Sequence, residues 1–267
     1  MKNYNFFLDI DGTLIPEGKK KISDAVITAI KKAKDGGHRF FINTARPYWL
    51  VPEDIFPSDV FDGICSGCGT YITYRGKIIY QKFISNSELK ALFKEIESYN
   101  MQDFSAIIES FETTYYHGIE RLEYSLMGYK KLRCADDIGS AVKDIKAQKF
   151  SFYRKAEDFP PSLLSKLKNE YNVMQHPTYV EVAQKGFSKA GAIKLVEREM
   201  SIPHESTVAI GDSHNDTEML GYAALSVAMG NAPHDVKSLC SYVTDTSEND
   251  GVAKAIELLT TVVPNLY

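Results

Sequence analysis

The sequence is short of cysteine, of long apolar runs and of excess charge, and each shortage excludes a class of protein. Only four cysteines occur in 267 residues, and Cys65 and Cys68 are the one closely spaced pair. Because no second pair accompanies them, a four-cysteine zinc site is excluded, and we expect reduced, structural thiols. No apolar run has the roughly 20 residues that a membrane-spanning helix needs. We also expect no signal peptide, because no leader pattern precedes the first predicted strand. Together these features predict a cytoplasmic protein.

The balance of charge gives no sign of a polyanionic partner. Lysine and arginine total 31 against 35 acidic residues, which leaves a net charge of −4. Nucleic acid and anionic membranes attract basic surfaces, so we expect neither as a partner. Hydrophobic residues make up 44% and charged residues 25%, which is typical of a globular domain with a substantial core. We find no internal repeat, and nothing in the sequence indicates an oligomeric state.

One short apolar segment near the N-terminus ends in two carboxylates. Residues 4–10 predict a buried strand, and Asp11-Gly12-Thr13 follows it as a sharp turn. Side chains alternate along a strand, so Asp9 and Asp11 should point to the same side. Two buried like charges are costly unless a cation lies between them or one of them stays protonated. The segment therefore predicts a cation site.

Strands and helices alternate on both sides of a middle section. This alternation predicts an α/β fold, with a parallel sheet that is covered by helices on both faces. The predicted strands are residues 4–10, 38–43, 61–65, 207–210, 225–229 and 242–244, with a hairpin at 71–74 and 77–81. The predicted helices are residues 24–35, 189–200, 215–221, 235–239 and 252–260, with a short helix beginning at Pro47.

The middle section predicts a separate α+β domain of about 100 residues, which is a normal domain size. We place it at residues 82–185, which leaves 1–81 and 186–267 as the core. Its predicted helices are residues 87–99, 136–147 and 160–171, and its predicted strands are 104–108, 149–153, 173–174 and 179–183. Residues 113–131 are rich in tyrosine and give no clear assignment.

Carboxylates follow several of the predicted core strands, where ligands bind in open parallel sheets. Asp9, Asp11 and Asp212 offer hard oxygen ligands, and this donor set favours Mg²⁺ over zinc or copper. A calcium-binding EF-hand loop is excluded, because Leu14 and Lys20 stand where that loop needs glycine and glutamate.

Other residues near these strand ends predict an anion site. Lys189 lies at the start of a predicted helix, and Thr44 stands with the N–H groups of Ala45 and Arg46. A metal ion, a lysine and N–H donors together describe a site for a phosphoryl group. Asp9 could then attack phosphorus, while Asp11 protonates the leaving oxygen and later activates water. Taken alone, Lys189 would be a solvated helix residue and Thr44 a helix cap; only the joint pattern indicates a site.

The sequence resembles the haloacid dehalogenase superfamily, and within it the Cof-like branch with a class IIB cap, which is typical of sugar phosphatases. Four motifs carry the resemblance: Asp9-Ile10-Asp11-Gly12-Thr13, Asn43-Thr44-Ala45-Arg46, Lys189, and Gly211-Asp212-Ser213-His214-Asn215-Asp216. The segments Val227-Ala228-Met229-Gly230-Asn231-Ala232 and Glu248-Asn249-Asp250-Gly251-Val252 also match the branch.

The resemblance implies a Rossmann-like core and an inserted α+β cap, with Asp9 as nucleophile and Asp11 as acid/base. It implies that Mg²⁺ is held by Asp9, the Asp11 carbonyl and Asp212, with Asp216 supporting that shell. It also implies that Thr44, Ala45, Lys189 and Asn215 bind the phosphate. Two departures from the family pattern stand out: Ala45 replaces the usual glycine, and Ser66-Gly67-Cys68 replaces Asn-Gly-Ala.

The leading hypothesis is a magnesium-dependent phosphatase that hydrolyses small phosphomonoesters through an aspartyl-phosphate intermediate, and we expect its substrates to be sugar phosphates. A phosphomutase of the same superfamily is the alternative enzyme, and it would retain the phosphoryl group by excluding water. A phospho-aspartate switch without enzymatic activity is a third hypothesis, which the acid/base Asp11 and the large insert argue against.

Overall fold

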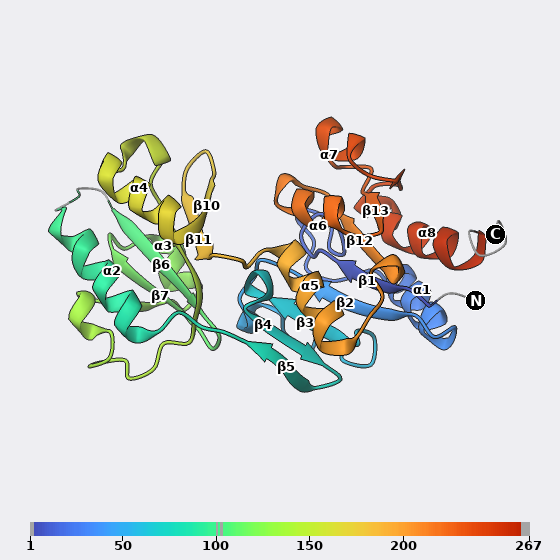
Figure 1. The fold of residues 1–267 in the computed structure, drawn as a ribbon, viewed down its shortest axis with the longest axis horizontal. Helices are drawn as coiled ribbons and strands as arrows, with labels where there is room; N and C mark the ends of the chain where they lie inside the picture. The colour runs from blue at the N-terminus through green and yellow to red at the C-terminus, as the bar shows by residue number, and fades with distance from the viewer. Residues whose placement is uncertain (1–2, 100, 102–103, 263–267) are drawn as a thin grey trace. The chain divides into compact units, whose positions relative to one another are not determined.

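The computed structural model describes residues 3–99, 101 and 104–262, and the chain divides into two compact units (Figure 1). The core unit comprises residues 1–46, 51–81 and 188–267. The inserted unit comprises residues 47–50 and 82–187, so it includes Pro47–Leu50, which the sequence-based boundary of 82–185 leaves in the core.

The core unit contains an eight-stranded sheet in the order β14-β13-β12-β1-β2-β3-β4-β5, and its parallel part confirms the predicted α/β class. The parallel strands are β1 (Asn5–Leu8), β2 (Arg39–Asn43), β3 (Gly63–Ser66), β12 (Thr207–Gly211), β13 (Leu225–Ala228) and β14 (Tyr242–Val243). The hairpin of β4 (Tyr71–Tyr74) and β5 (Lys77–Gln81) adds two antiparallel strands at one edge.

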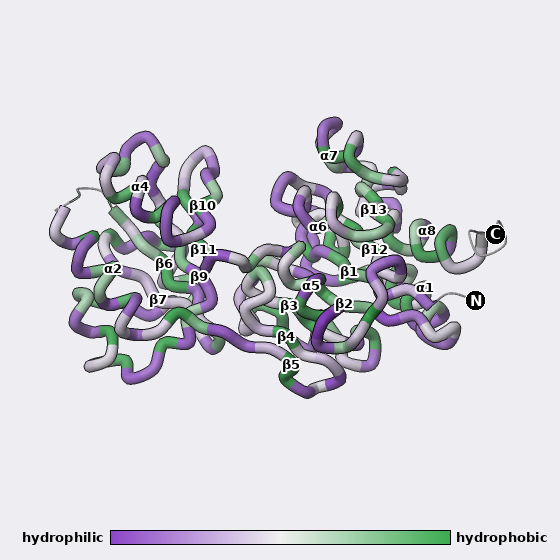
Figure 2. The backbone as a smooth tube through the Cα atoms, viewed as in Figure 1, coloured by the Kyte–Doolittle hydropathy of each residue, from purple (hydrophilic) through white to green (hydrophobic). Residues whose placement is uncertain are grey.

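Helices cover both faces of this sheet because its strands are apolar on both sides. Phe6 and Phe40 stack at 4.7 Å on one face, within the cluster that includes α1 (Asp24–Asp35) and α8 (Gly251–Glu257). Phe7 and Phe41 stack at 5.1 Å on the other face, which is covered by α5 (Lys189–Met200), α6 (Thr217–Tyr222) and α7 (His234–Ser238). Much of the tube through β12 and β13 is accordingly green, the colour of hydrophobic residues (Figure 2). The last helix ends at Glu257 and continues as a π-helical turn, Leu258–Val262.

The inserted unit is built on a six-stranded sheet in the order β10-β11-β9-β6-β7-β8, in which β7–β8 is the parallel pair. Its strands are β6 (Ser105–Ser110), β7 (Thr114–Gly118), β8 (Lys130–Leu132), β9 (Ala147–Phe152), β10 (Tyr171–Gln175) and β11 (Val180–Gln184). One face carries Ile108, Phe150 and Val182, which belong to the same apolar cluster as residues of α2 (Asn86–Ser98) and α4 (Pro161–Glu170). Such a one-sided apolar face is typical of antiparallel sheets.

The predicted helix at residues 136–147 is wrong. The chain forms a short 3₁₀ turn there, Ala135–Asp137, and then runs on irregularly to β9. The Asp137 carboxylate accepts hydrogen bonds from the Arg133 backbone N–H at 2.7 Å and from its guanidinium, and a side chain that bonds local backbone competes with a helix. Gly139 then adopts a φ of +84°, which ends any helical continuation.

The tyrosine-rich residues 113–131, which the sequence left unassigned, form β7, the short helix α3 (Leu122–Leu126) and the start of β8. The segment at Pro47 forms a 3₁₀ turn, Tyr48–Leu50, in place of the short helix that was predicted. No helix within the described residues is both long enough and apolar enough to cross a bilayer.

Candidate active site

The end of β1 brings Asp9 beside the loop that follows β12. Asp9 is 3% exposed, and its backbone N–H donates to the Ile210 carbonyl at 3.1 Å. Gly12 has a φ of +80°, and a Cβ placed on it would lie 2.2 Å from Asp212 Oδ2. Only glycine allows the two loops to approach this closely, so Gly12 is a steric requirement of the site.

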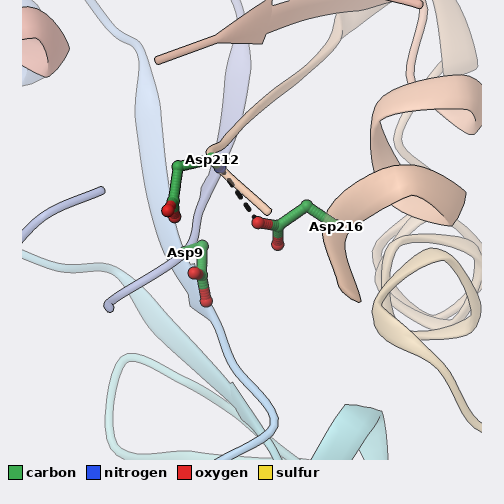
Figure 3. Close-up of side chains that lie close together, drawn as sticks. All are labelled: Asp9, Asp212 and Asp216. Atoms are coloured by element: carbon green, nitrogen blue, oxygen red, sulfur yellow. Dashed lines mark hydrogen bonds between the residues drawn. The ribbon is translucent and has the colours of Figure 1, made fainter. Parts of the chain in front are cut away.

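Three carboxylates meet at this point from two loops (Figure 3). Ligand oxygens of Asp9, Asp212 and Asp216 all lie within 4.8 Å of one another. Asp216 Oδ2 accepts the backbone N–H groups of Asp212 at 3.0 Å and Ser213 at 3.1 Å, so this side chain fixes the shape of its own loop. Asp212 Oδ1 accepts the Thr13 hydroxyl at 2.9 Å, which ties this loop to the one after β1.

Burial in the site disfavours the charged form of two of its carboxyl groups and raises their pKa values. Burial raises the pKa of Asp9 to about 7, with Lys189 opposing the shift and Asp216 adding to it. Burial also raises the pKa of Asp212 to about 6, where the Thr13 hydroxyl opposes the shift and Asp216 adds to it. The donor set consists of carboxylate oxygens with no thiol or imidazole, which fits a hard divalent cation such as Mg²⁺.

Lys189 supplies positive charge from the first turn of α5. Ser188 caps this helix, because its hydroxyl accepts the Gly191 N–H at 3.1 Å. The Lys189 ammonium donates to Asp9 Oδ1 and Asp216 Oδ1 at 2.6 Å each and to Asn215 Oδ1 at 2.9 Å. Burial alone would lower the pKa of Lys189, but Asp216 and Asp9 outweigh it and raise that pKa, so the ammonium stays charged.

The Thr44 loop after β2 is braced by the turn that follows β3. Thr44 is 1% exposed; its carbonyl accepts the Cys68 N–H at 3.1 Å, and the Arg46 carbonyl accepts the Gly67 N–H at 2.8 Å. A Cβ on Gly69 would lie 2.8 Å from the Cβ of Ala192 in α5, so this turn also packs closely on the helix that carries Lys189. The sequence suggested that the Arg46 N–H donates to a bound anion. In the structure this N–H donates to Thr44 Oγ1 at 3.1 Å, within the same loop.

The Asp11 carboxyl is not part of the cluster of Asp9, Asp212 and Asp216, which could hold a metal ion. β1 ends at Leu8, so the alternation of a strand no longer applies at Asp11. The Asp11 side chain is 65% exposed and forms a two-pronged ion pair with Arg46, with Nε–Oδ2 at 2.9 Å and Nη2–Oδ1 at 2.5 Å. This geometry leaves the Asp11 carboxyl out of the group that could hold a metal.

The side chains of two residues of the site, Arg46 and Asn231, were given no role by the sequence reasoning. The sequence reasoning used only the backbone N–H of Arg46, as a donor to an anion, whereas the Arg46 guanidinium forms an ion pair with Asp11. Asn231 donates from Nδ2 to the Gly12 carbonyl at 2.9 Å and to Asp212 Oδ2 at 3.4 Å, while its Oδ1 accepts the Ser247 N–H at 2.9 Å. The signal was available for Asn231, because it follows β13 at the same sheet edge as Asp9 and Asp212.

The chain belongs to the haloacid dehalogenase-like hydrolase family, whose model matches residues 6–256. It is 28% identical to the 5-amino-6-(5-phospho-D-ribitylamino)uracil phosphatase YitU of Bacillus subtilis, over 96% of this chain and 97% of that protein. It is 26% identical to the putative phosphatase YkrA of the same organism, over 95% of this chain and 96% of that protein.

Solved structures show the same fold along nearly the whole chain. The phosphatase BT1666 of Bacteroides thetaiotaomicron superposes with a TM-score of 0.81 at 24% identity, over 96% of this chain and 94% of that one. The subclass IIB sugar phosphatase BT4131 gives a TM-score of 0.79 at 24% identity, over 96% and 98% of the two chains respectively. These likenesses confirm the α/β architecture with its inserted α+β unit.

Proposed function

We propose that this protein is a magnesium-dependent phosphatase that hydrolyses small phosphomonoesters through an aspartyl-phosphate intermediate. Sugar phosphates are the proposed class of substrate. One observation carries the proposal: a buried Asp9 is held by the Lys189 ammonium at 2.6 Å beside two further carboxylates. The names of the relatives support it, since YitU and YkrA are both called phosphatases.

The reaction needs a nucleophile and a proton carrier. An Asp9 carboxylate oxygen attacks phosphorus, the bond from phosphorus to the ester oxygen breaks, and Asp11 gives its proton to that oxygen. Water then attacks the phosphorus of the aspartyl-phosphate, Asp11 takes a proton from that water, and the bond from Asp9 to phosphorus breaks. Free phosphate leaves, and both aspartates return to their starting forms.

Arg46 has to release Asp11 for these proton transfers. The ion pair keeps the Asp11 carboxyl on the guanidinium, outside the Asp9 cluster. Its exposed position leaves the carboxyl able to rotate, whereas Asp9 is fixed by burial. We therefore assign the movable carboxyl to the protons and the fixed carboxyl to phosphorus.

The remaining residues hold the charge of the phosphoryl group. Asp9, Asp212 and the Asp11 backbone carbonyl would hold Mg²⁺, and Asp216 would shape the loop around it. When bound, the cation neutralises charge on the phosphoryl oxygens and on the carboxylates. Thr44, Ala45, Lys189 and Asn215 bind the phosphate in this proposal. The inserted unit, as a cap, selects the alcohol portion of the substrate.

Substitution of Asp9 tests the proposal. We expect Asp9→Asn to abolish release of phosphate from p-nitrophenyl phosphate with Mg²⁺, because a carboxamide is a poor nucleophile, while circular dichroism stays unchanged. Asp59→Asn is the matched control, since Asp59 is an exposed carboxylate of the core unit that pairs with Lys31. Normal turnover by Asp9→Asn would remove the nucleophile assignment.

A substrate panel then separates phosphatase from phosphomutase. Sugar phosphates and 5-amino-6-(5-phospho-D-ribitylamino)uracil, the substrate in the name of YitU, belong in the panel. A phosphatase releases one phosphate for each ester consumed. A phosphomutase would isomerise sugar phosphates, require a bisphosphate as activator and release little phosphate.

A further inference from the structure

Asn43 is a fully buried amide directly beside the phosphate-binding residues. It is the last residue of β2, has no exposed surface and precedes Thr44. Phe40, Phe41 and Ile42 before it are apolar, as expected of a strand that is covered on both faces. A polar side chain in this position therefore departs from the pattern of its own strand.

The Asn43 amide is tied to the backbone of Lys189. Its Nδ2 donates to the Lys189 carbonyl at 2.9 Å and lies 3.4 Å from the Met219 sulfur. Its Oδ1 is buried and accepts no hydrogen bond from any residue that the structure describes. A buried acceptor without a partner lowers stability, so this side chain is not explained by stability.

The Lys189 carbonyl does not need the amide either. Lys189 is the first residue of α5, and in an α-helix its carbonyl accepts the N–H of the residue four positions later. Replacing Asn43 with an apolar side chain of similar volume would thus leave no new buried group unpaired and would remove the unpaired Oδ1. The amide costs stability through its unpaired Oδ1, and its hydrogen bond ends on the lysine that is proposed to bind phosphate, which points to a functional role.

The hydrogen bonds of the Lys189 ammonium explain why the position of its backbone has to be fixed. All three of its N–H groups are used by Asp9, Asn215 and Asp216. A phosphoryl group that binds Lys189 has to replace one of these acceptors, and Asn215 is the exposed one with the longest contact. The lysine side chain is long and flexible, so its reach then depends on where the first turn of α5 is held.

We propose that Asn43 is a positioning residue, whose bond to the Lys189 carbonyl fixes the first turn of α5 against the end of β2. It thereby holds the Lys189 ammonium in place while that ammonium exchanges an acceptor for the phosphoryl group. This inference rests on the proposed function, in which Lys189 binds phosphate.

The test compares Asn43→Leu with the wild type in stability, catalysis and binding of inorganic phosphate. We expect an unchanged or higher melting temperature, because the unpaired Oδ1 is gone. We expect kcat/KM for p-nitrophenyl phosphate to fall about 2- to 10-fold, the usual worth of one hydrogen bond, and the affinity for inorganic phosphate to fall by a similar factor. Asn43→Ala is the smaller second variant and should lose the same affinity.

The matched control is Asn5→Leu, at the start of neighbouring β1. Asn5 is also a buried asparagine and donates to Ser206 Oγ at 2.9 Å, but its bond does not involve Lys189. We expect this variant to lose stability and to keep the kcat/KM of the wild type. Opposite effects of the two substitutions on stability and catalysis would separate positioning from packing.

A double-mutant cycle shows whether Asn43 acts through Lys189. In a Lys189→Met background, Asn43→Leu should cause no further loss of kcat/KM, whereas a packing role would give an additive loss. The inference is overturned if Asn43→Leu keeps wild-type phosphate affinity and kcat/KM, or if its stability and activity fall together. If the wild-type protein neither binds nor releases phosphate, the proposed function fails and this inference fails with it.

Discussion

Each unit of the molecule buries one lysine between two carboxylates, and the two clusters differ in how they are built. In the core unit, the Lys189 side chain is 2% exposed and lies 2.6 Å from both Asp9 and Asp216. In the inserted unit, the Lys149 side chain is 5% exposed and lies 2.8 Å from Glu181 and 3.3 Å from Glu109. A buried ion cluster is therefore not in itself evidence of a catalytic site.

The difference lies in the backbone that carries the charges. Lys149 and Glu109 face each other across β9 and β6, and Glu181 lies on β11, so all three are fixed by antiparallel ladders of one sheet. Burial raises the pKa of Glu109, with Lys149 opposing and Glu181 adding to the shift. Lys189 instead begins a helix, and its partners end strands or lie in loops, with Asp212 as a third carboxylate. Loops at strand ends leave room for a ligand, which the middle of a sheet does not.

Of the substitutions that test this difference between the two clusters, Lys189→Met should have the largest effect on activity. Because the ammonium contacts the nucleophile and is proposed to bind phosphate, we expect kcat/KM for p-nitrophenyl phosphate to fall by about 10²-fold or more. Steady-state kinetics measure the loss, and Lys149→Met is the matched control, expected to stay within about 3-fold of wild type. Equal losses in the two variants would mean that the position of the clusters does not separate their roles.

Lys149→Met should act on stability. Removal of one partner leaves the buried Glu181 and the partly buried Glu109 without a compensating charge, which costs about 3–5 kcal/mol of unfolding free energy. Urea unfolding measures the cost. The triple variant Glu109→Leu, Lys149→Met, Glu181→Leu should recover most of it, because no charge is then left unpaired. A triple variant as unstable as the single one would show that the cluster stabilises the sheet by more than mutual neutralisation.

The smallest expected effect is a dependence of metal binding on pH. The pKa values of Asp9 and Asp212 are raised to about 7 and about 6, so the metal-free folded state holds protons that the unfolded chain has lost. The stability that this protonation contributes is present at low pH and is lost as the pH rises through about 6 to 7. Mg²⁺ has to displace these protons, so it should raise the melting temperature more at about pH 8 than at about pH 5.5.

Calorimetry with and without Mg²⁺ at the two pH values checks this prediction, with EDTA-treated protein as the baseline. Asp9→Asn should show a smaller difference between the two pH values, because one of the two titrating carboxyls is gone. An equal rise in melting temperature at both pH values would mean that these carboxylates do not hold the cation.

The sequence predicted the core sheet and most of the polar residues at the carboxyl ends of its strands, because the patterns that indicate them span only a few neighbouring residues. An apolar run that ends in a carboxylate places Asp9 at a strand end, and the same pattern places Asp212 beside it once the sheet is parallel. The ion pair between Asp11 and Arg46 could not be predicted from neighbouring residues. It depends on a guanidinium 35 residues away and on the end of β1 at Leu8, neither of which a strand period encodes.

The failures in the inserted unit have the same origin. Residues 136–147 have apolar spacing that suits a helix, but Asp137 binds the Arg133 backbone and Gly139 takes a positive φ. The Lys149 cluster was also missed, because Glu109 and Glu181 lie 40 and 32 residues from it in sequence. Only strand order and register bring these side chains together.

The close approach of Gly12 to Asp212 has a consequence for how the protein comes into being. The two loops are 199 to 200 residues apart in sequence, and the whole inserted unit is synthesised between them. Closing so long a loop is slow relative to local pairing, so β1 has to wait for β12 before the carboxylate cluster exists. The inserted unit has its own sheet and apolar core and needs no such wait. The carboxylate cluster therefore forms only after the loops that follow β1 and β12 have been brought together.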